Sequence, residues 1–318
     1  MEYRRFGRTG LEVSIMGLGS GGPSQLGQGS GVPEKEAAQV VRKALDLGIN
    51  LIDTAADYRD SEAILGRALR GVTRESYILC TKFNPVTKRG SPDNSLKPEQ
   101  ALEESLERSL ERLQTDYVDV FQLHGVAPED YTAVRDRFVP AAKKLQAQGK
   151  FRFLGLTETF ATDDKHETLT QGLEDDLWDT MMVGYNLLTP LPVEHVLPEA
   201  KRRDVGILVM CAVRRAIARP EKLEELIREL KDRGDLPHDA LPEHGPLDWL
   251  VHDGVESVTA AAYKFAAGHP GVSCVLTGTA NPQHLEENVA AIGGSMLPEA
   301  DRRRIIELFG PIQRNLGN

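Results

Sequence analysis

The side chains best suited to acid–base chemistry lie in the stretch from Gly48 to Leu69. An apolar pair, Leu51–Ile52, predicts a short buried strand, and Asp53 follows at the carboxyl end of that strand. Tyr58 comes five residues later, on the loop that leads into a segment with helical apolar periodicity. The sequence therefore predicts a carboxylate and a phenol close to one edge of a sheet.

Two more polar residues stand at the ends of predicted strands. Lys82 ends the predicted strand at 77–82, within the sequence LCTKF. His124 follows the predicted strand at 118–123, within the sequence VFQLH. Taken singly, Asp53 reads as a loop cap, and Tyr58, Lys82 and His124 read as structural or surface groups. Because the carboxyl ends of parallel barrel strands meet at one mouth, all four together favour a catalytic cluster.

Such a cluster is suited to general acid–base chemistry, in which a positioned side chain gives a proton to the substrate. A tyrosine phenol has an ordinary pKa of about 10 and is a poor acid at neutral pH. The ammonium of Lys82 favours the phenolate and lowers that pKa. Asp53 can orient Lys82, and His124 can donate a hydrogen bond to the substrate oxygen. No metal is required, and the eight histidines show no metal-ligand spacing.

The elements that must position these residues alternate along the chain. Residues 1–13 predict a β-hairpin with its turn at 7–10. Eight strands, each followed by a predicted helix, are expected at 15–18, 51–53, 77–82, 118–123, 151–156, 180–185, 206–210 and 272–276. This alternation demands a parallel sheet, and eight units predict an α/β fold, a (β/α)8 TIM barrel with an N-terminal β-hairpin. We expect residues 1–318 to form a single domain.

The run GINLIDTAADYRDSEAILGRAL at 48–69 resembles the signature of the aldo-keto reductases, including its Asp–Tyr spacing and its SE-x-x-LG-x-AL tail. The similarity extends from YRRFGRTGLEVS near the start to NPQHLEENVAAI near the end. It implies an oxidoreductase with the catalytic tetrad Asp53, Tyr58, Lys82 and His124. It also implies NADP, with NAD as the alternative, bound across the barrel mouth.

The resemblance assigns cofactor contacts as well. They are Ser20, Asp53, Thr157, Gly278, Thr279, His284, Glu287 and Asn288. Gly278 and His284 stand where many members carry the lysine and arginine that hold the adenosine 2′-phosphate. Free amides at the start of a helix over 282–291 can still attract that phosphate.

Four residues, in three segments of the chain, differ from the usual nicotinamide clamp. Thr157 and Glu158 replace a Ser-Asn pair, Met182 replaces a glutamine, and Cys211 replaces a stacking aromatic residue. These departures indicate a subfamily variant or weak cofactor binding. Beside this clamp, Arg214 and Arg215 are either pyrophosphate contacts or solvated surface charges.

A glycine-rich segment follows the first barrel strand. It contains G-x-G-x-x-G at 17, 19 and 22, but no helix opens directly behind it, as the dinucleotide fingerprint requires. We interpret residues 19–31 as a mobile loop over the barrel mouth.

Composition limits the classes of partner. Lys+Arg 38 against Asp+Glu 48 gives a net charge of -10, which argues against nucleic acid and anionic membrane as partners. The three cysteines form no C-x-x-C pair, and the N-terminus lacks the apolar core of a signal peptide. No apolar run reaches membrane-spanning length, so we expect a cytoplasmic protein.

The sequence therefore predicts an NAD(P)H-dependent aldo-keto reductase acting on a small-molecule carbonyl. One alternative is an NAD-dependent sugar dehydrogenase, favoured by the missing cations beside the 2′-phosphate. Another is a non-enzymatic cofactor-binding regulatory subunit resembling potassium-channel β subunits. We expect substrate choice to come from the loops at 19–32, 84–97 and 213–255. The sequence does not indicate the oligomeric state.

Overall fold

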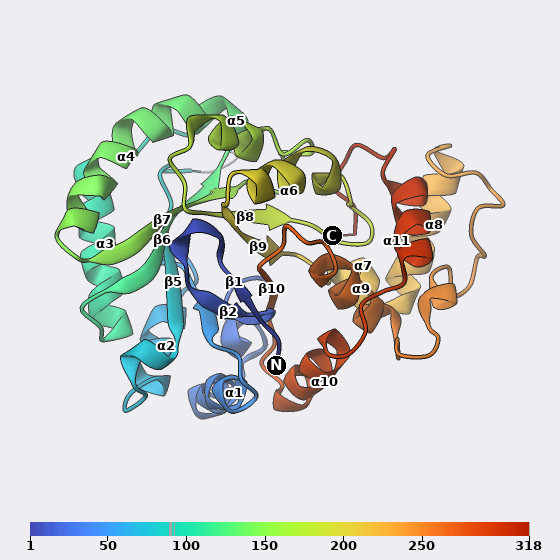
Figure 1. Ribbon diagram of the computed structural model, residues 1–318, viewed down its shortest axis with the longest axis horizontal. Coiled ribbons are helices and arrows are strands. Elements are labelled where there is room, and N and C mark those ends of the chain that lie inside the picture. The colour runs from blue at the N-terminus through green and yellow to red at the C-terminus, as the bar shows by residue number, and fades with distance from the viewer. Residues whose placement is uncertain (89–90, 92, 318) are drawn as a thin grey trace.

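The computed structural model describes residues 1–88, 91 and 93–317. Within these residues, parallel strands close into a barrel in the order β10-β3-β4-β5-β6-β7-β8-β9, ringed by helices (Figure 1). The strands are β3 (Met16–Gly19), β4 (Leu51–Asp53), β5 (Ile78–Phe83), β6 (Val118–Val126), β7 (Phe151–Glu158), β8 (Thr180–Gly184), β9 (Gly206–Met210) and β10 (Cys274–Thr277). The predicted (β/α)8 barrel with an N-terminal β-hairpin is confirmed.

Helices follow the barrel strands in the order that the alternation predicts. They are α1 (Glu34–Asp46), α2 (Ser61–Ala68), α3 (Gln100–Leu113), α4 (Tyr131–Ala147), α5 (Glu167–Asp175), α6 (Pro192–Arg202), α7 (Arg215–Ala218), α8 (Pro220–Asp232), α9 (Val258–Ala267), α10 (Pro282–Ile292) and α11 (Glu299–Phe309). The main difference from expectation is the length of β6, which runs beyond residue 123 through a register shift between Leu123 and Val126. His124 therefore lies inside a strand that bends at the barrel mouth.

The N-terminal hairpin closes the amino end of the barrel. Its strands β1 (Tyr3–Arg5) and β2 (Glu12–Ser14) pair antiparallel, and Gly10 takes the left-handed conformation that the turn requires, at φ 68°. Phe6, between the two strands, is fully buried against inward-facing residues of the barrel such as Leu51 and Val120. An apolar plug thus fills this end, and polar chemistry is left to the opposite, carboxyl end.

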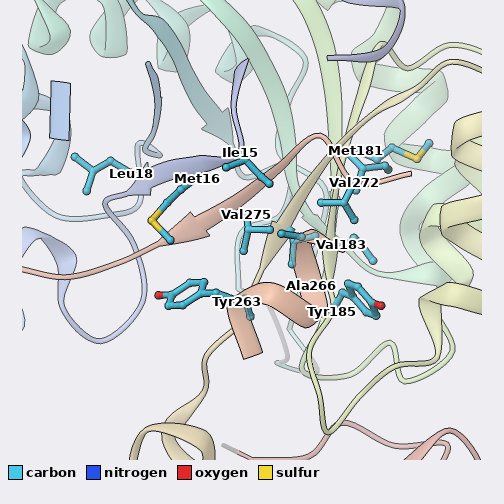
Figure 2. Packing of buried hydrophobic residues seen from close by; sticks show 14 of the residues in the cluster. Ile15, Met16, Leu18, Met181, Val183, Tyr185, Tyr263, Ala266, Val272 and Val275 are labelled. Atoms are coloured by element: carbon cyan, nitrogen blue, oxygen red, sulfur yellow. The ribbon is translucent and has the colours of Figure 1, made fainter. Parts of the chain in front are cut away.

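Apolar side chains on the outer face of the strands pack against the helices. Figure 2 shows Tyr263 and Ala266 of α9 beside Val275 of β10 and Val183 of β8, all of them buried. Each helix contributes one apolar stripe, as in α3, whose Leu102, Leu106, Leu110 and Leu113 are buried. This second layer of the core holds the strand ends in place around the mouth.

Two of the three expected mouth loops contain helical segments. The segment expected to be mobile, at 19–31, includes η2 (Gln25–Ser30), and its Gln28 side chain donates to Ser61 Oγ at 3.0 Å and accepts from Asp60 N at 3.0 Å. The segment at 213–255 includes α7, α8 and η5 (Asp248–Leu250). In the loop at 84–97, residues 89, 90 and 92 lie outside the described residues.

A buried carboxylate organises the amino end of the sheet. Asp119, at the start of β6, accepts from Arg74 Nη2 at 2.6 Å, from Arg152 Nη1 at 2.7 Å and from the backbone N–H of Leu79 at 2.9 Å. Arg74 also stacks on Tyr117, with its guanidinium carbon 4.2 Å from the ring centroid. This network joins strands β5, β6 and β7 at the end remote from the predicted chemistry.

We expect Asp119→Asn to destabilise the fold by about 2–4 kcal/mol, because two arginines and an amide lose a buried charged acceptor. Turnover per folded molecule should stay the same, since the barrel mouth is untouched. Asp136→Asn is the matched control: Asp136 pairs with Arg135 on the surface and should contribute below about 1 kcal/mol. Urea unfolding of both variants checks this, and equal losses would contradict it.

Candidate active site

An ion pair between Asp53 and Lys82 lies at the carboxyl end of the barrel. Asp53 is the last residue of β4, Lys82 is near the end of β5, and Lys82 Nζ donates to Asp53 Oδ2 at 2.6 Å. Lys82 Nζ also donates to the Thr54 carbonyl at 2.6 Å, and Gln122 Nε2 donates to Asp53 Oδ1 at 3.3 Å. Both charged side chains are buried, at 1% exposed for Lys82 and 3% for Asp53. The pair is therefore fixed from three strands.

Burial and mutual attraction act in opposite directions on the two charges. Burial raises the pKa of Asp53, and the Lys82 ammonium only partly opposes that rise. Burial alone would depress the pKa of Lys82, but Asp53 and Tyr58 outweigh it and raise that pKa above its ordinary value. We conclude that Lys82 is held as an ammonium ion.

Tyr58 lies directly beside this ammonium. Lys82 Nζ is 5.0 Å from the centroid of the Tyr58 ring, and the Tyr58 hydroxyl is 3.5 Å from Nε2 of His124. The two rings meet edge to face, with centroids 5.6 Å apart. The structure thus brings together Asp53, Tyr58, Lys82 and His124, the four residues that the sequence predicts as a cluster.

Sequence reasoning missed two residues that shape this cluster. A Cβ on Gly21 would lie 2.6 Å from the Tyr58 ring, so only glycine fits there. Gln122 orients Asp53 from β6. The position of Gln122, two residues before His124 and so on the same face of its strand, was the available signal. Gly21 lies in a glycine-rich run, and no local sequence feature distinguishes it from its neighbours.

Ser20 and Asn288, two of the predicted cofactor contacts, differ in whether their side chains are already engaged. The Ser20 backbone N–H donates to the Asp53 carbonyl at 2.9 Å, while its hydroxyl is buried and has no hydrogen-bond partner among the described residues. Asn288 Nδ2 donates to Thr277 Oγ1 at 2.9 Å and so tethers α10 to β10. Ser20 therefore offers an unused hydroxyl, whereas the amide of Asn288 is engaged.

The other residues predicted to contact the adenosine end lie around the start of α10. Thr279 Oγ1 accepts from the backbone N–H of Asn281 at 3.1 Å, and Glu287 accepts from Gln283 at 2.9 Å. His284 is exposed, and so is Gly278, which directly follows β10. The first turn of α10 carries no acidic residue, and its last turn carries no basic one.

Thr157 and Glu158 end β7 and face different ways. Thr157 Oγ1 accepts from the backbone N–H of Gly125 at 2.6 Å, across the irregular end of β6. Glu158 accepts from the backbone N–H of Gly184, on β8, at 2.8 Å. Its other oxygen lies 2.8 Å from Nδ1 of His166, at the start of α5. Glu158 therefore cannot replace the family asparagine as a free hydrogen-bonding group.

The Glu158–His166 pair is buried, and no local sequence pattern predicts it. Burial raises the pKa of Glu158, opposed by His166, whereas Glu158 raises the pKa of His166 against the effect of burial. His166 adopts a left-handed conformation, at φ 56°, which is unusual for a residue with a side chain. The pair fastens β7, β8 and α5 behind the barrel mouth.

The two other residues that differ from the nicotinamide clamp, Met182 and Cys211, offer no amide or aromatic ring. Met182 is buried among the inward-facing barrel residues, so it contributes packing in place of an amide. Cys211 lies just past β9 at φ 61°, and burial raises the pKa of its thiol. No cluster of histidine, cysteine, aspartate and glutamate suited to a metal occurs in the residues that the structure describes. No described helix is long and apolar enough to cross a membrane.

Glu158→Gln should destabilise the protein by about 1–3 kcal/mol near pH 6, because it removes the charge that holds His166 protonated. Since Glu158 raises the His166 pKa, the contribution of the protonated imidazole is present below the ordinary histidine value of about 6.5. It is lost as pH rises through the raised folded-state value, so the difference should shrink toward about pH 9.

Chemical unfolding of wild type and variant at both pH values measures this difference. Glu194→Gln is the control, because Glu194 and His195 form an exposed Glu–His pair at 3.8 Å and should contribute below about 1 kcal/mol. A difference that grows with pH would show that the ion pair does not stabilise the fold.

Comparisons with known proteins agree with this architecture. The family model described as "Aldo/keto reductase family" matches residues 16–308. The chain is 30% identical to L-galactose dehydrogenase from Arabidopsis thaliana, over 92% of this chain and 88% of the relative. It is also 30% identical to aldo-keto reductase YhdN from Bacillus subtilis, over 96% and 92% of the two chains.

A solved structure gives the same result. The holo form of aldo-keto reductase AKR11C1 from Bacillus halodurans superposes with a TM-score of 0.74 at 27% identity, covering 97% of this chain and 96% of that one. The family match spans the strands that carry Asp53, Lys82 and His124. The chain therefore belongs to the aldo/keto reductase family.

Proposed function

We propose that this protein is a single-domain NADP(H)-dependent reductase that converts small aldehydes or ketones to alcohols, with Tyr58 as the proton donor. The observation that carries this proposal is the contact between a buried ammonium and a phenol that faces a histidine. Lys82 lies 5.0 Å from the Tyr58 ring, and the Tyr58 hydroxyl lies 3.5 Å from His124. Membership of an oxidoreductase family supplies the reaction class.

The residues of the cluster divide the proton chemistry among themselves. The bound nicotinamide supplies the hydride for the carbonyl carbon. Tyr58 donates its proton to the carbonyl oxygen, and the Lys82 ammonium stabilises the phenolate that remains. Asp53 keeps Lys82 in place, while His124 hydrogen-bonds the substrate oxygen and directs it toward Tyr58. Reversal of these steps oxidises an alcohol.

Residues around the mouth are suited to a dinucleotide. Ser20 offers a buried hydroxyl that has no partner among the described residues, and an inaccessible polar group of this kind is costly unless a ligand engages it. Thr157 keeps a hydroxyl proton to donate, because its oxygen acts as acceptor for Gly125. Gly278 and the amides that begin α10 leave backbone groups for phosphate oxygens. Together with Asp53, Thr279, His284, Glu287 and Asn288, these residues form the proposed cofactor site.

A second candidate function is an NAD-dependent sugar dehydrogenase. One observation favours it: α10 carries no lysine or arginine near its start, and Glu286 and Glu287 follow His284 on that helix. A 2′-phosphate at the start of α10 would find no lysine or arginine on that helix, and the nearby Lys43 of α1 is paired with Glu286. The relative named L-galactose dehydrogenase makes an aldose a substrate to test in the oxidative direction.

We expect Tyr58→Phe to lower kcat by at least about a hundredfold and to leave NADPH affinity within about twofold, because it removes only the proton-donating hydroxyl. Steady-state assays with a panel of aldehydes and fluorescence titration with NADPH measure both quantities. Tyr117→Phe removes the same atom at the amino end of the barrel, where Tyr117 stacks under Arg74, and should leave kcat unchanged. Full activity in Tyr58→Phe would refute the assignment of Tyr58.

Cofactor selection separates the two candidate functions. We expect NADPH to bind more tightly than NADH by only about two- to tenfold, because backbone amides and a single imidazole replace the usual cations. His284→Arg should raise the affinity for NADPH about tenfold and leave that for NADH unchanged. Titration of both cofactors with both proteins checks this. Tighter NADH binding together with aldose oxidation would favour the sugar dehydrogenase.

A further inference from the structure

The glycine-rich segment after β3 is fastened to the start of α2 by the side-chain amide of Gln28. Its Nε2 donates to Ser61 Oγ at 3.0 Å and to the Gln25 carbonyl at 2.9 Å. Its Oε1 accepts from the backbone N–H of Asp60 at 3.0 Å. The side chain of Asp60 makes no cap for α2, so Gln28 supplies an acceptor at this helix start from a separate segment. We call these contacts of Gln28 with Gln25, Asp60 and Ser61 the Gln28 network.

Two hydrogen bonds connect the Gln28 network to Gly21. Ser61 Oγ donates to the Ser20 carbonyl at 3.2 Å, and this carbonyl belongs to the peptide group that precedes Gly21. The backbone N–H of Gln25 donates to the Gly21 carbonyl at 3.3 Å, which belongs to the peptide group that follows. Both peptide groups that flank Gly21 are therefore held by residues that Gln28 itself engages.

Gly21 in turn packs against the reacting end of Tyr58. A Cβ on Gly21 would lie 2.6 Å from Cε2 and Cζ of the Tyr58 ring and 3.0 Å from its hydroxyl oxygen. Gln28 Nε2 also lies 3.5 Å from the backbone carbonyl of Tyr58. The phenol is therefore bounded by the glycine-rich segment as well as by Lys82 and His124.

The backbone of this segment adopts a costly conformation. Gln25 and Leu26 are both left-handed, at φ 44° and 54°, and Gly27 follows at φ 88°. A side chain makes that conformation unfavourable, so it persists only where the surroundings over-determine it. Leu26 is 1% exposed and anchors the turn in the hydrophobic core, while Gln28 anchors it to α2. Loss of the Gln28 amide would leave a strained turn with a single anchor.

We propose that Gln28 is a positioning residue for carbonyl reduction, which holds Gly21 against Tyr58 and so keeps the phenol hydroxyl where it donates its proton. This role rests on the proposed function, in which Tyr58 is the proton donor. Gln28 acts through Gly21 and is not itself a catalytic residue. Proton transfer requires heavy atoms about 2.6–3.2 Å apart. A displacement of about 1 Å can therefore slow the chemical step about a hundredfold.

Gln28→Ala should lower the single-turnover rate of NADPH oxidation by about tenfold to a hundredfold and leave the Kd of NADPH within about threefold. Gln28→Glu should recover part of the rate, because its carboxylate still accepts from Asp60 N–H at the helix start. Gln146→Ala is the matched control: Gln146 also donates to a backbone carbonyl, that of Arg152, at 2.6 Å, but at the amino end of the barrel. It should leave the rate within about twofold.

A double variant tests whether Gln28 and Ser61 act through one chain of contacts. Ser61→Ala removes both the acceptor for Gln28 and the donor to Ser20, so it should slow the single-turnover rate as well. Because the two residues are coupled, the double variant should be within about twofold of the slower single variant. Multiplied losses would show that they act separately and would contradict the proposal. Stopped-flow fluorescence of NADPH measures each rate, and thermal unfolding establishes that each variant folds.

The inference is wrong if Gln28→Ala folds, melts at a lower temperature than wild type and keeps the wild-type single-turnover rate, since Gln28 would then be structural only. If Gln28→Ala fails to fold, Ser61→Ala decides by the same rate. The proposed function is tested separately, by carbonyl reduction in the wild type and its loss in Tyr58→Phe.

Hydrogen exchange distinguishes failure of the inference from failure of the proposed function. An inactive wild type would refute the function, and the exchange of backbone amides at 19–31 would then test the Gln28 network by itself. Faster exchange in Gln28→Ala than in Gln146→Ala would show that Gln28 fastens the segment. Equal exchange in the two variants would refute the network as well.

Discussion

The structure depends above all on one constraint, the burial of the Asp53–Lys82 ion pair inside the carboxyl end of the barrel. Removing two charges from water is expensive, and attraction offsets the cost only when the geometry is close and the remaining polar atoms are satisfied. Here the pair is 2.6 Å apart, and Thr54 and Gln122 supply the additional hydrogen bonds. Strands β4, β5 and β6 must therefore keep their register for the site to exist.

The two ends of the barrel divide stability from chemistry. At the amino end, Phe6 fills the interior and Asp119 binds two arginines and a backbone amide, so that end is apolar inside. At the carboxyl end, Ser20 and Arg214 keep buried polar atoms without partners among the described residues. Unsatisfied buried groups are costly in a folded protein, and each one calls for an explanation such as a bound ligand or an ordered water.

The strand ends of β7 and β8 show how the nicotinamide side differs from the usual family pattern. A free amide is replaced by Glu158, whose charge is balanced by His166 and whose second oxygen holds the β8 backbone. Both oxygens hold the scaffold, so neither is free to replace the family amide. Phe160 connects this ion pair to Arg214, because it stacks on both side chains. The ion pair and the arginine at this edge therefore share one aromatic neighbour.

The barrel, the hairpin and the four residues of the cluster could be predicted from the sequence, because they follow from local periodicity and from a short motif with strict spacing. Strand ends were predicted within a few residues, and the bend that carries β6 past His124 was not. Only the tertiary structure revealed the need for glycine at position 21, the Glu158–His166 pair and the different burial of Arg214 and Arg215. These features arise where separate loops meet, and no local pattern records which side chain an approaching segment will cover or leave without a partner.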